Sequence, residues 1–330
     1  MSTTLFLLIP IGMLAVVWSV CFVGCVLQTS GLESPYSNNN LAEPSLVAYW
    51  PLSDLPNSPP PAGAPALPPP PQGSTGVGTA QDLSGKNHNG TYIKPPAYMP
   101  GASIPQIVTN PTLNLQQASI VPGDAFASGS KNLPFCVDFE GGYVSIPWAA
   151  NSPALTDFTL EAWIQPKWNV MGFNWVVFSA HTGNGTGFAI FINTQNQWQL
   201  SVGNGTALTA VNTMVPAAVN GSLTYVAMTF ESATQVLSLW INPGTESDSN
   251  TPPPPTAAFT TQTTYVAVDP TQPVTFFIGA GDNQDAPRTQ AGGSGAPLVP
   301  FQGLIQSVAL YNTALDPTDL ASHFQNGTGG

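Results

Sequence analysis

From residue 135 onward, the sequence is a succession of short apolar runs separated by turn-forming residues. The run Phe158–Ile164 alternates apolar and other residues with a period of two, as a strand does. Asn193–Asn196 and Glu231–Thr234 each join two such runs, and each predicts a β-hairpin. Short strands at this spacing predict an all-β fold, a sandwich or jelly roll. The expected strands are 46–50, 135–139, 143–146, 158–164, 175–180, 187–192, 197–202, 223–230, 235–241, 265–268, 275–278 and 304–311.

Composition agrees with this fold class. Only 7% of the residues are charged, and the chain has 31 Gly and 35 Pro. Exposed amphipathic helices need charged residues on their wet face, so this composition favours strands and turns. The five Lys and Arg residues are scattered along a chain of net charge −12, which argues against nucleic-acid binding.

One helix is predicted near the C-terminus. Asp316 suits the N-cap, Pro317 the first helical position and Asp319 the acidic first turn. Gly327 is expected to end this helix.

The N-terminal segment Leu5–Leu27 contains no charged residue. As a helix it would be about 34 Å long, enough to cross a bilayer core of about 30 Å. We expect an uncleaved, single-pass anchor in the lipid bilayer, with a cytoplasmic N-terminus and an extracytoplasmic domain. The orientation rests on the scarcity of Lys and Arg. A cleaved signal peptide and lipoprotein processing at Cys25 are the alternatives.

These features predict the domain organisation. Residues 1–28 form the anchor and 29–45 a polar tether. Residues 46–326 form the sandwich, followed by a tail at 327–330. The sandwich region contains two Pro-rich or irregular insertions, 55–80 and 95–134.

Five segments of the sandwich region resemble a known family. Leu46–Leu52 (LVAYWPL) and Asp82–Thr91 resemble the opening of laminin G-like, concanavalin A-like domains. Phe158–Pro166 (FTLEAWIQP), Tyr225–Phe230 and Gly303–Leu315 are similar to three later strands of such domains, in the same order. The resemblance implies a jelly-roll β-sandwich over about residues 46–326. The insertions depart from the family pattern.

Catalysis is not expected, although the superfamily includes glycoside hydrolases. Their paired acids follow the arrangement E-x-D-x-x-E, which does not occur here. Asp138 and Glu140 are two residues apart and share one face of a strand, and we interpret them as the lead into a turn. His88, His181 and His323 lack a nucleophile signature nearby and are predicted to be solvated.

Two kinds of ligand site remain. Calcium is the one cofactor considered, because Asp282, Asn283 and Asp285 gather oxygen ligands in one loop; a solvated acidic loop is the alternative. Sugar binding would use the exposed aromatic residues of 168–175, and core packing is their alternative role. The candidate sugar-binding residues are Trp168, Phe173 and Trp175. Asn-Gly-Thr/Ser triplets begin at Asn89, Asn184, Asn204, Asn220 and Asn326, and we assign them to tight turns.

Two functional classes follow. In the first, the protein is a non-catalytic accessory subunit that docks on other subunits of a membrane complex, photosynthetic or respiratory. Pro-rich segments such as 55–80 suit long, shallow protein contacts because they are already extended. In the second, the protein is a cell-surface, lectin-like adhesion module that binds glycans.

Overall fold

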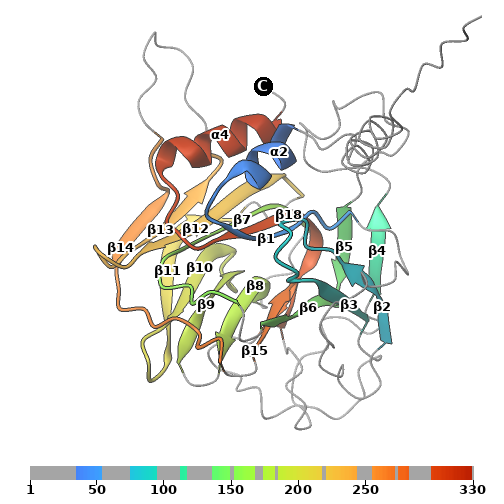
Figure 1. The fold of residues 1–330 in the computed structure, drawn as a ribbon, viewed down its shortest axis with the longest axis horizontal. Coiled ribbons are helices and arrows are strands. Elements are labelled where there is room, and N and C mark those ends of the chain that lie inside the picture. The colour runs from blue at the N-terminus through green and yellow to red at the C-terminus, as the bar shows by residue number, and fades with distance from the viewer. Residues whose placement is uncertain are drawn as a thin grey trace, which may run out of the picture. The chain divides into compact units, whose positions relative to one another are not determined.

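Two antiparallel sheets of eight strands each face one another in the computed structural model of the protein (Figure 1). The structure describes residues 35–53, 75–94, 112–116, 136–148, 152–167, 174–182, 185–217, 221–243, 255–271, 274–281 and 299–328. This two-sheet architecture is that of a jelly-roll β-sandwich, as the strand pattern predicts.

We name the first sheet sheet A. Its spatial order is β14 (Phe259–Gln262), β13 (Val236–Ile241), β12 (Thr224–Glu231), β7 (Phe158–Pro166), β18 (Gln302–Tyr311), β5 (Cys136–Glu140) and β4 (Thr112–Gln116). Strand β1 (Leu46–Trp50) pairs with the C-terminal half of β18, whereas β5 pairs with the N-terminal half. Sheet A therefore combines segments from both ends of the chain.

Sheet B lies on the other side of the core. Its spatial order is β11 (Leu208–Pro216), β10 (Gln197–Gly203), β9 (Thr186–Ile192), β8 (Trp175–Thr182), β15 (Val274–Ile278), β6 (Tyr143–Trp148), β3 (Gly90–Lys94) and β2 (Thr75–Ala80). A small additional sheet pairs β16 (Ala280–Gly281) with β17 (Val299–Pro300).

The main core fills the space between the two sheets. Alternate residues of each strand point into it, as the strand period of two requires. The rings of Phe158 on β7 and Phe188 on β9 stack across the two sheets, with their centroids 3.9 Å apart. Each fully buried side chain of this kind contributes about 1.5–3 kcal/mol to folding.

Two helices cover the outer face of sheet A, α2 (Pro35–Ala42) and α4 (Pro317–Thr328) (Figure 1). They touch one another and bury a second apolar cluster that includes Trp163, Tyr225 and Trp240. For this reason both faces of β7 are buried, not only the inward one. The period of two in this segment separates two buried faces rather than a buried face from a wet one.

Most predicted strands are present within a residue or two of their expected bounds. The run 265–268 is the exception, because it has no regular secondary structure. The helix begins as predicted: Asp316 Oδ1 accepts the N–H groups of Thr318 and Asp319 at 2.7 and 3.0 Å. It continues through Gly327 to Thr328, so the predicted C-terminal end is wrong. Cys136, at the start of β5, is fully buried.

Eight elements were not expected from the sequence. Helix α2 lies within the predicted tether, β2 at the end of the 55–80 insertion and β4 within 95–134. Strands β3, β11, β14, β16 and β17 were missed as well. The predicted anchor Leu5–Leu27 lies outside the described residues, and among the helices that the structure describes none is long and apolar enough to span a bilayer.

Candidate functional site

Two carboxylates project from the outer face of sheet A on strand β5. Val137 and Phe139 belong to the core between the sheets, so the alternate residues Asp138 and Glu140 point the other way. Asp138 pairs in register with Leu304 of β18, and Glu140 with Gln302. The strand pattern of β5 thus places both acids on one face, as the sequence predicts.

A single ammonium group joins these carboxylates. Lys167 follows the last residue of β7, and its Nζ lies 3.0 Å from Asp138 Oδ2 and also contacts Glu140 Oε1. The Lys167 side chain is 42% exposed, Glu140 40% and Asp138 11%. The cluster is therefore open to solvent on one side and anchored in the sheet on the other.

Close backbone packing fixes the position of Lys167. Its N–H donates to the carbonyl of Gln302 at 3.1 Å. The neighbouring Gly303 has a φ of 138°, and a Cβ there would stand 2.5 Å from the carbonyl oxygen of Gln165. Only glycine allows β18 to approach the end of β7 this closely. The ammonium is thereby held over β5.

The electrostatics of the cluster follow from its partial burial. Burial raises the pKa of Asp138, and the Lys167 ammonium offsets this effect only in part. Burial tends to lower the pKa of Lys167, but Glu140 and Asp138 outweigh it and the pKa is raised. Lys167 is therefore charged at neutral pH. The cluster presents donor and acceptor groups side by side, which suits a ligand rich in hydroxyl groups.

Of the three candidate aromatic residues, only Trp175 lies within the described residues. Trp168 and Phe173 lie outside the described residues, although Trp168 directly follows Lys167 in the sequence. Trp175 is on β8, is only 1% exposed and meets Phe301 edge to face at 6.0 Å. It is a core residue, so its expected place at a binding rim is corrected. Every tryptophan within the described ranges is buried in the same way.

The proposed calcium ligands Asp282, Asn283 and Asp285 also lie outside the described residues. In the part of the chain that the structure does describe, no three His, Cys, Asp or Glu side chains come together as a metal site would require. The calcium site stays a prediction.

The three histidines correct another expectation. His88, His181 and His323 were predicted to be solvated, but their exposed fractions are 8%, 2% and 0%. His88 stacks on Trp148 at a centroid distance of 4.5 Å and bonds Ser152 through Nε2 at 3.0 Å. His88 packs against Trp148 and His323 against Glu161, neighbours from distant segments that no local pattern reveals.

A second polar cluster, which the sequence did not suggest, lies beneath the helices around Glu161. This carboxylate is fully buried on the outer face of β7. Tyr36 and Tyr311 donate their hydroxyls to Oε1 at 3.1 and 3.0 Å. Oε2 accepts the hydroxyl of Tyr225 and lies 2.9 Å from Nδ1 of His323. With four partners and no exposure, this cluster is a structural network rather than an open site.

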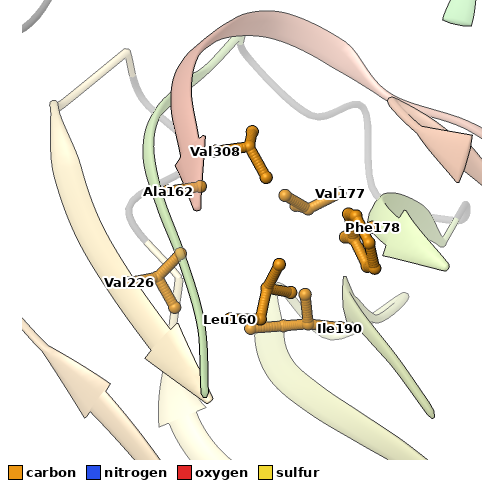
Figure 2. A pocket seen from close by; sticks show the side chains of 7 residues that line it. All are labelled: Leu160, Ala162, Val177, Phe178, Ile190, Val226 and Val308. Atoms are coloured by element: carbon orange, nitrogen blue, oxygen red, sulfur yellow. The ribbon is translucent and has the colours of Figure 1, made fainter. Parts of the chain in front are cut away.

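A small cavity lies at the centre of the sandwich (Figure 2). Its volume is about 10 Å³, and its lining is entirely apolar. Figure 2 shows side chains from both sheets around it, namely Leu160, Ala162, Val177, Phe178, Ile190, Val226 and Val308. This space holds at most about one water molecule and has no polar group for one, so it is a packing void.

Three solved structures are similar to the chain at low sequence identity. Domain 4 of the arabinanase AbnA from Geobacillus stearothermophilus, solved with arabinotriose, is 15% identical, with a TM-score of 0.45 over 74% of this chain and 92% of that one. A carbohydrate-binding protein described as putative, from Bacteroides ovatus, is 15% identical, with a TM-score of 0.42 over 59% and 51%. The binding domain of botulinum neurotoxin DC, solved with SialylT, is 13% identical, with a TM-score of 0.43. The match covers 74% of this chain and 48% of the toxin chain.

Sequence comparison is more specific for one part of the chain. No curated protein matches the chain significantly. Residues 138–284, from β5 to just beyond β16, match the sequence model of the Laminin_G_3 family. The description of this model is the concanavalin A-like lectin/glucanases superfamily, to which the chain is similar over residues 138–284.

Proposed function

We propose that the sandwich is a non-catalytic carbohydrate-recognition module. Its ligand would contact Asp138, Glu140 and Lys167, with Trp168 and Phe173 as the stacking residues. The observation that carries this proposal is the half-exposed Lys167 ammonium, held between two carboxylates immediately before Trp168. Sugar sites commonly combine a few fixed polar groups with an aromatic face.

The pairing of the acids supports binding rather than hydrolysis. A retaining or inverting glycosidase needs one carboxylate free to attack or to activate water, and one to donate a proton. Lys167 contacts both Asp138 and Glu140, so each carboxylate already has a charged partner. The same contacts hold the oxygens in fixed positions for hydroxyl groups of a ligand.

The experiment is a glycan-array measurement on the full-length protein in mild detergent. Lys167→Met keeps most of the side-chain volume and removes the ammonium, so binding should fall at least about tenfold, a loss of about 1.4 kcal/mol. Thr209→Ala, at an exposed position on β11 in the other sheet, is the matched control and should bind as the wild type does. Unchanged binding by Lys167→Met would overturn the assignment of the site.

A docking role is the second candidate, and strand β11 favours it. This strand is at the edge of sheet B and has nine residues without a charge, and its Met214 is 66% exposed. Edge strands are usually protected by charged residues, which are absent from β11. We retain as proposals that the protein docks on membrane-complex subunits and that Leu5–Leu27 anchors it with an extracytoplasmic sandwich.

A further inference from the structure

Helix α2 is attached to the sandwich through the fully buried side chains of Tyr36 and Asn40 and through the partly buried Leu41. Tyr36 is fully buried, and its ring meets the indole of Trp163 edge to face at 6.0 Å. Its hydroxyl reaches Glu161 on β7. Two further polar contacts of α2 are less buried. The hydroxyls of Ser37 and Tyr49 are 2.8 Å apart, and Nδ2 of Asn39 donates to the hydroxyl of Ser322 at 3.4 Å at the surface. We call the surface formed by Trp163, Glu161, Tyr225, Tyr311 and His323 the α2 socket.

His323 is the basic residue of the α2 socket and lies between two carboxylates. Its Nδ1 lies 2.9 Å from Glu161, and its Nε2 lies 3.8 Å from Oε1 of Glu43, which follows the last residue of α2. The imidazole thus stands between a carboxylate of sheet A and a carboxylate at the end of α2. A protonated ring has an N–H on both nitrogens and can face two carboxylates at once.

We propose that the α2 socket is a docking site for α2 that holds this helix only while His323 is protonated. A neutral imidazole donates from one nitrogen alone, so the other would turn a lone pair toward a carboxylate. The Glu43 contact would then be lost, and the buried charge of Glu161 would lose its compensating cation. The end of α2 would be released from α4.

The surroundings of His323 are consistent with a protonated ring. Burial tends to lower the pKa of His323, but Glu161, Glu43 and Asp319 of α4 outweigh it and the pKa is raised. Burial likewise opposes ionisation of Glu161, yet His323 and the tyrosine hydroxyls hold its pKa below the usual range. The pKa values of Tyr36, Tyr225 and Tyr311 are raised by burial and then by Glu161, so these phenols stay neutral.

Release of α2 would be local. The helix has eight residues, contains no charged residue and has no stabilising propensity of its own, so it depends on its contacts. Strand β7, which carries Glu161 and Trp163, is paired with β12 and β18 and does not need α2 for its hydrogen bonds. Local opening of such a segment is separable from global unfolding.

Amide hydrogen exchange of the full-length protein tests this proposal. Exchange of residues 36–44, corrected for the intrinsic effect of pH, should become at least about tenfold less protected between about pH 6 and about pH 9. Strands β9 and β10 of sheet B should keep their protection over the same range. Constant protection of α2, or loss in parallel with β9 and β10, would overturn the proposal.

Variants separate the contact from the fold. Glu43→Gln removes only the outer charge, from a side chain that is 23% exposed, so the sandwich should remain folded. Protection of α2 at about pH 6 should fall toward its value at high pH, with a smaller dependence on pH. Glu140→Gln, which alters an ion pair away from the socket, is the matched control and should leave α2 unchanged. If both variants behave as the wild type does, the proposal is wrong.

Discussion

Gly327 of α4 lies so close to Trp163 of β7 that a Cβ on the glycine would stand 2.3 Å from Cζ2 of the indole. The helix can approach sheet A at this point only because the residue has no side chain. The indole cannot easily move aside, since Tyr36, Tyr225 and Phe324 pack around it. Gly327 therefore sets the distance between α4 and the sheet.

Gly327→Ala should destabilise the protein. Helix propensity alone would predict a gain of about 0.5–1 kcal/mol for this change. The clash with Trp163 should reverse the sign and cost about 1–3 kcal/mol, as overpacking does. Urea denaturation measures the difference. Ser322→Ala, on the exposed face of α4, should change the free energy of unfolding by less than about 0.5 kcal/mol. A more stable Gly327→Ala variant would contradict this packing.

Glu161→Ala should be among the most damaging single changes in the protein. It leaves three tyrosine hydroxyls and the His323 imidazole without their acceptor in a buried site. Removing one partner of a buried pair costs about 3–5 kcal/mol. Glu231→Ala, at the exposed end of β12, is the matched control and should cost far less. Thermal unfolding compares the two, and equal melting temperatures would contradict the role of Glu161.

Stability should pass through a maximum with pH because of the Glu161–His323 pair. The pKa of Glu161 is lowered on folding, so its contribution is present above about pH 4.3 and is lost as the pH falls through the folded value. The pKa of His323 is raised, so its contribution is present below about pH 6.5 and is lost as the pH rises through the folded value. Urea titrations at several pH values should therefore show the highest stability between these limits.

The control for this pH profile is His323→Gln, which removes the titrating imidazole. Its stability should be lower near neutral pH and should no longer decline above the ordinary histidine range. A decline in the variant equal to that of the wild type would assign the alkaline loss to other groups.

Asp82→Ala should loosen the connection between β1 and the loop that precedes β3. Asp82 Oδ1 accepts the backbone N–H groups of Tyr49 and Ser84 at 2.9 Å, and Oδ2 accepts that of His88 at 2.8 Å. Each buried donor left without a partner costs about 1–3 kcal/mol. Asp269→Ala, at an exposed turn, should change little. Amide exchange at Tyr49 reports the loss directly, and full protection there would contradict it.

The sequence predicts the elements that local patterns encode and misses those that distant contacts create. Phe158–Pro166 is recognisable as a strand because its alternation is local. Helix α2 has the sequence PYSNNNLA, without amphipathic periodicity, and exists because Tyr36 enters a socket built by β7, β12, β18 and α4. Strand β11 has mixed exposure and is defined by its pairing with β10.

The same reasoning explains the candidate site. The spacing of Asp138 and Glu140 predicts that they share a face, and they do. Their connection through Lys167 depends on the close approach of β18 to the end of β7 at Gly303, which brings together residues far apart in the sequence. The burial of Trp175 could not be predicted from the sequence either, since exposed and buried aromatic residues occur in the same sequence pattern.

Glycan-array binding by paired variants of the full-length protein tests carbohydrate recognition most directly. Trp168→Ala should abolish the glycan binding of the wild type, because the stacking of the indole on a sugar ring is lost. Replacement of residues 56–72 by a short Gly/Ser linker should leave glycan binding intact. Circular dichroism should confirm that both variants keep their sheet content. The account is contradicted if Trp168→Ala binds glycans as the wild type does while the linker variant no longer copurifies with other membrane proteins, since the protein would then be a docking subunit.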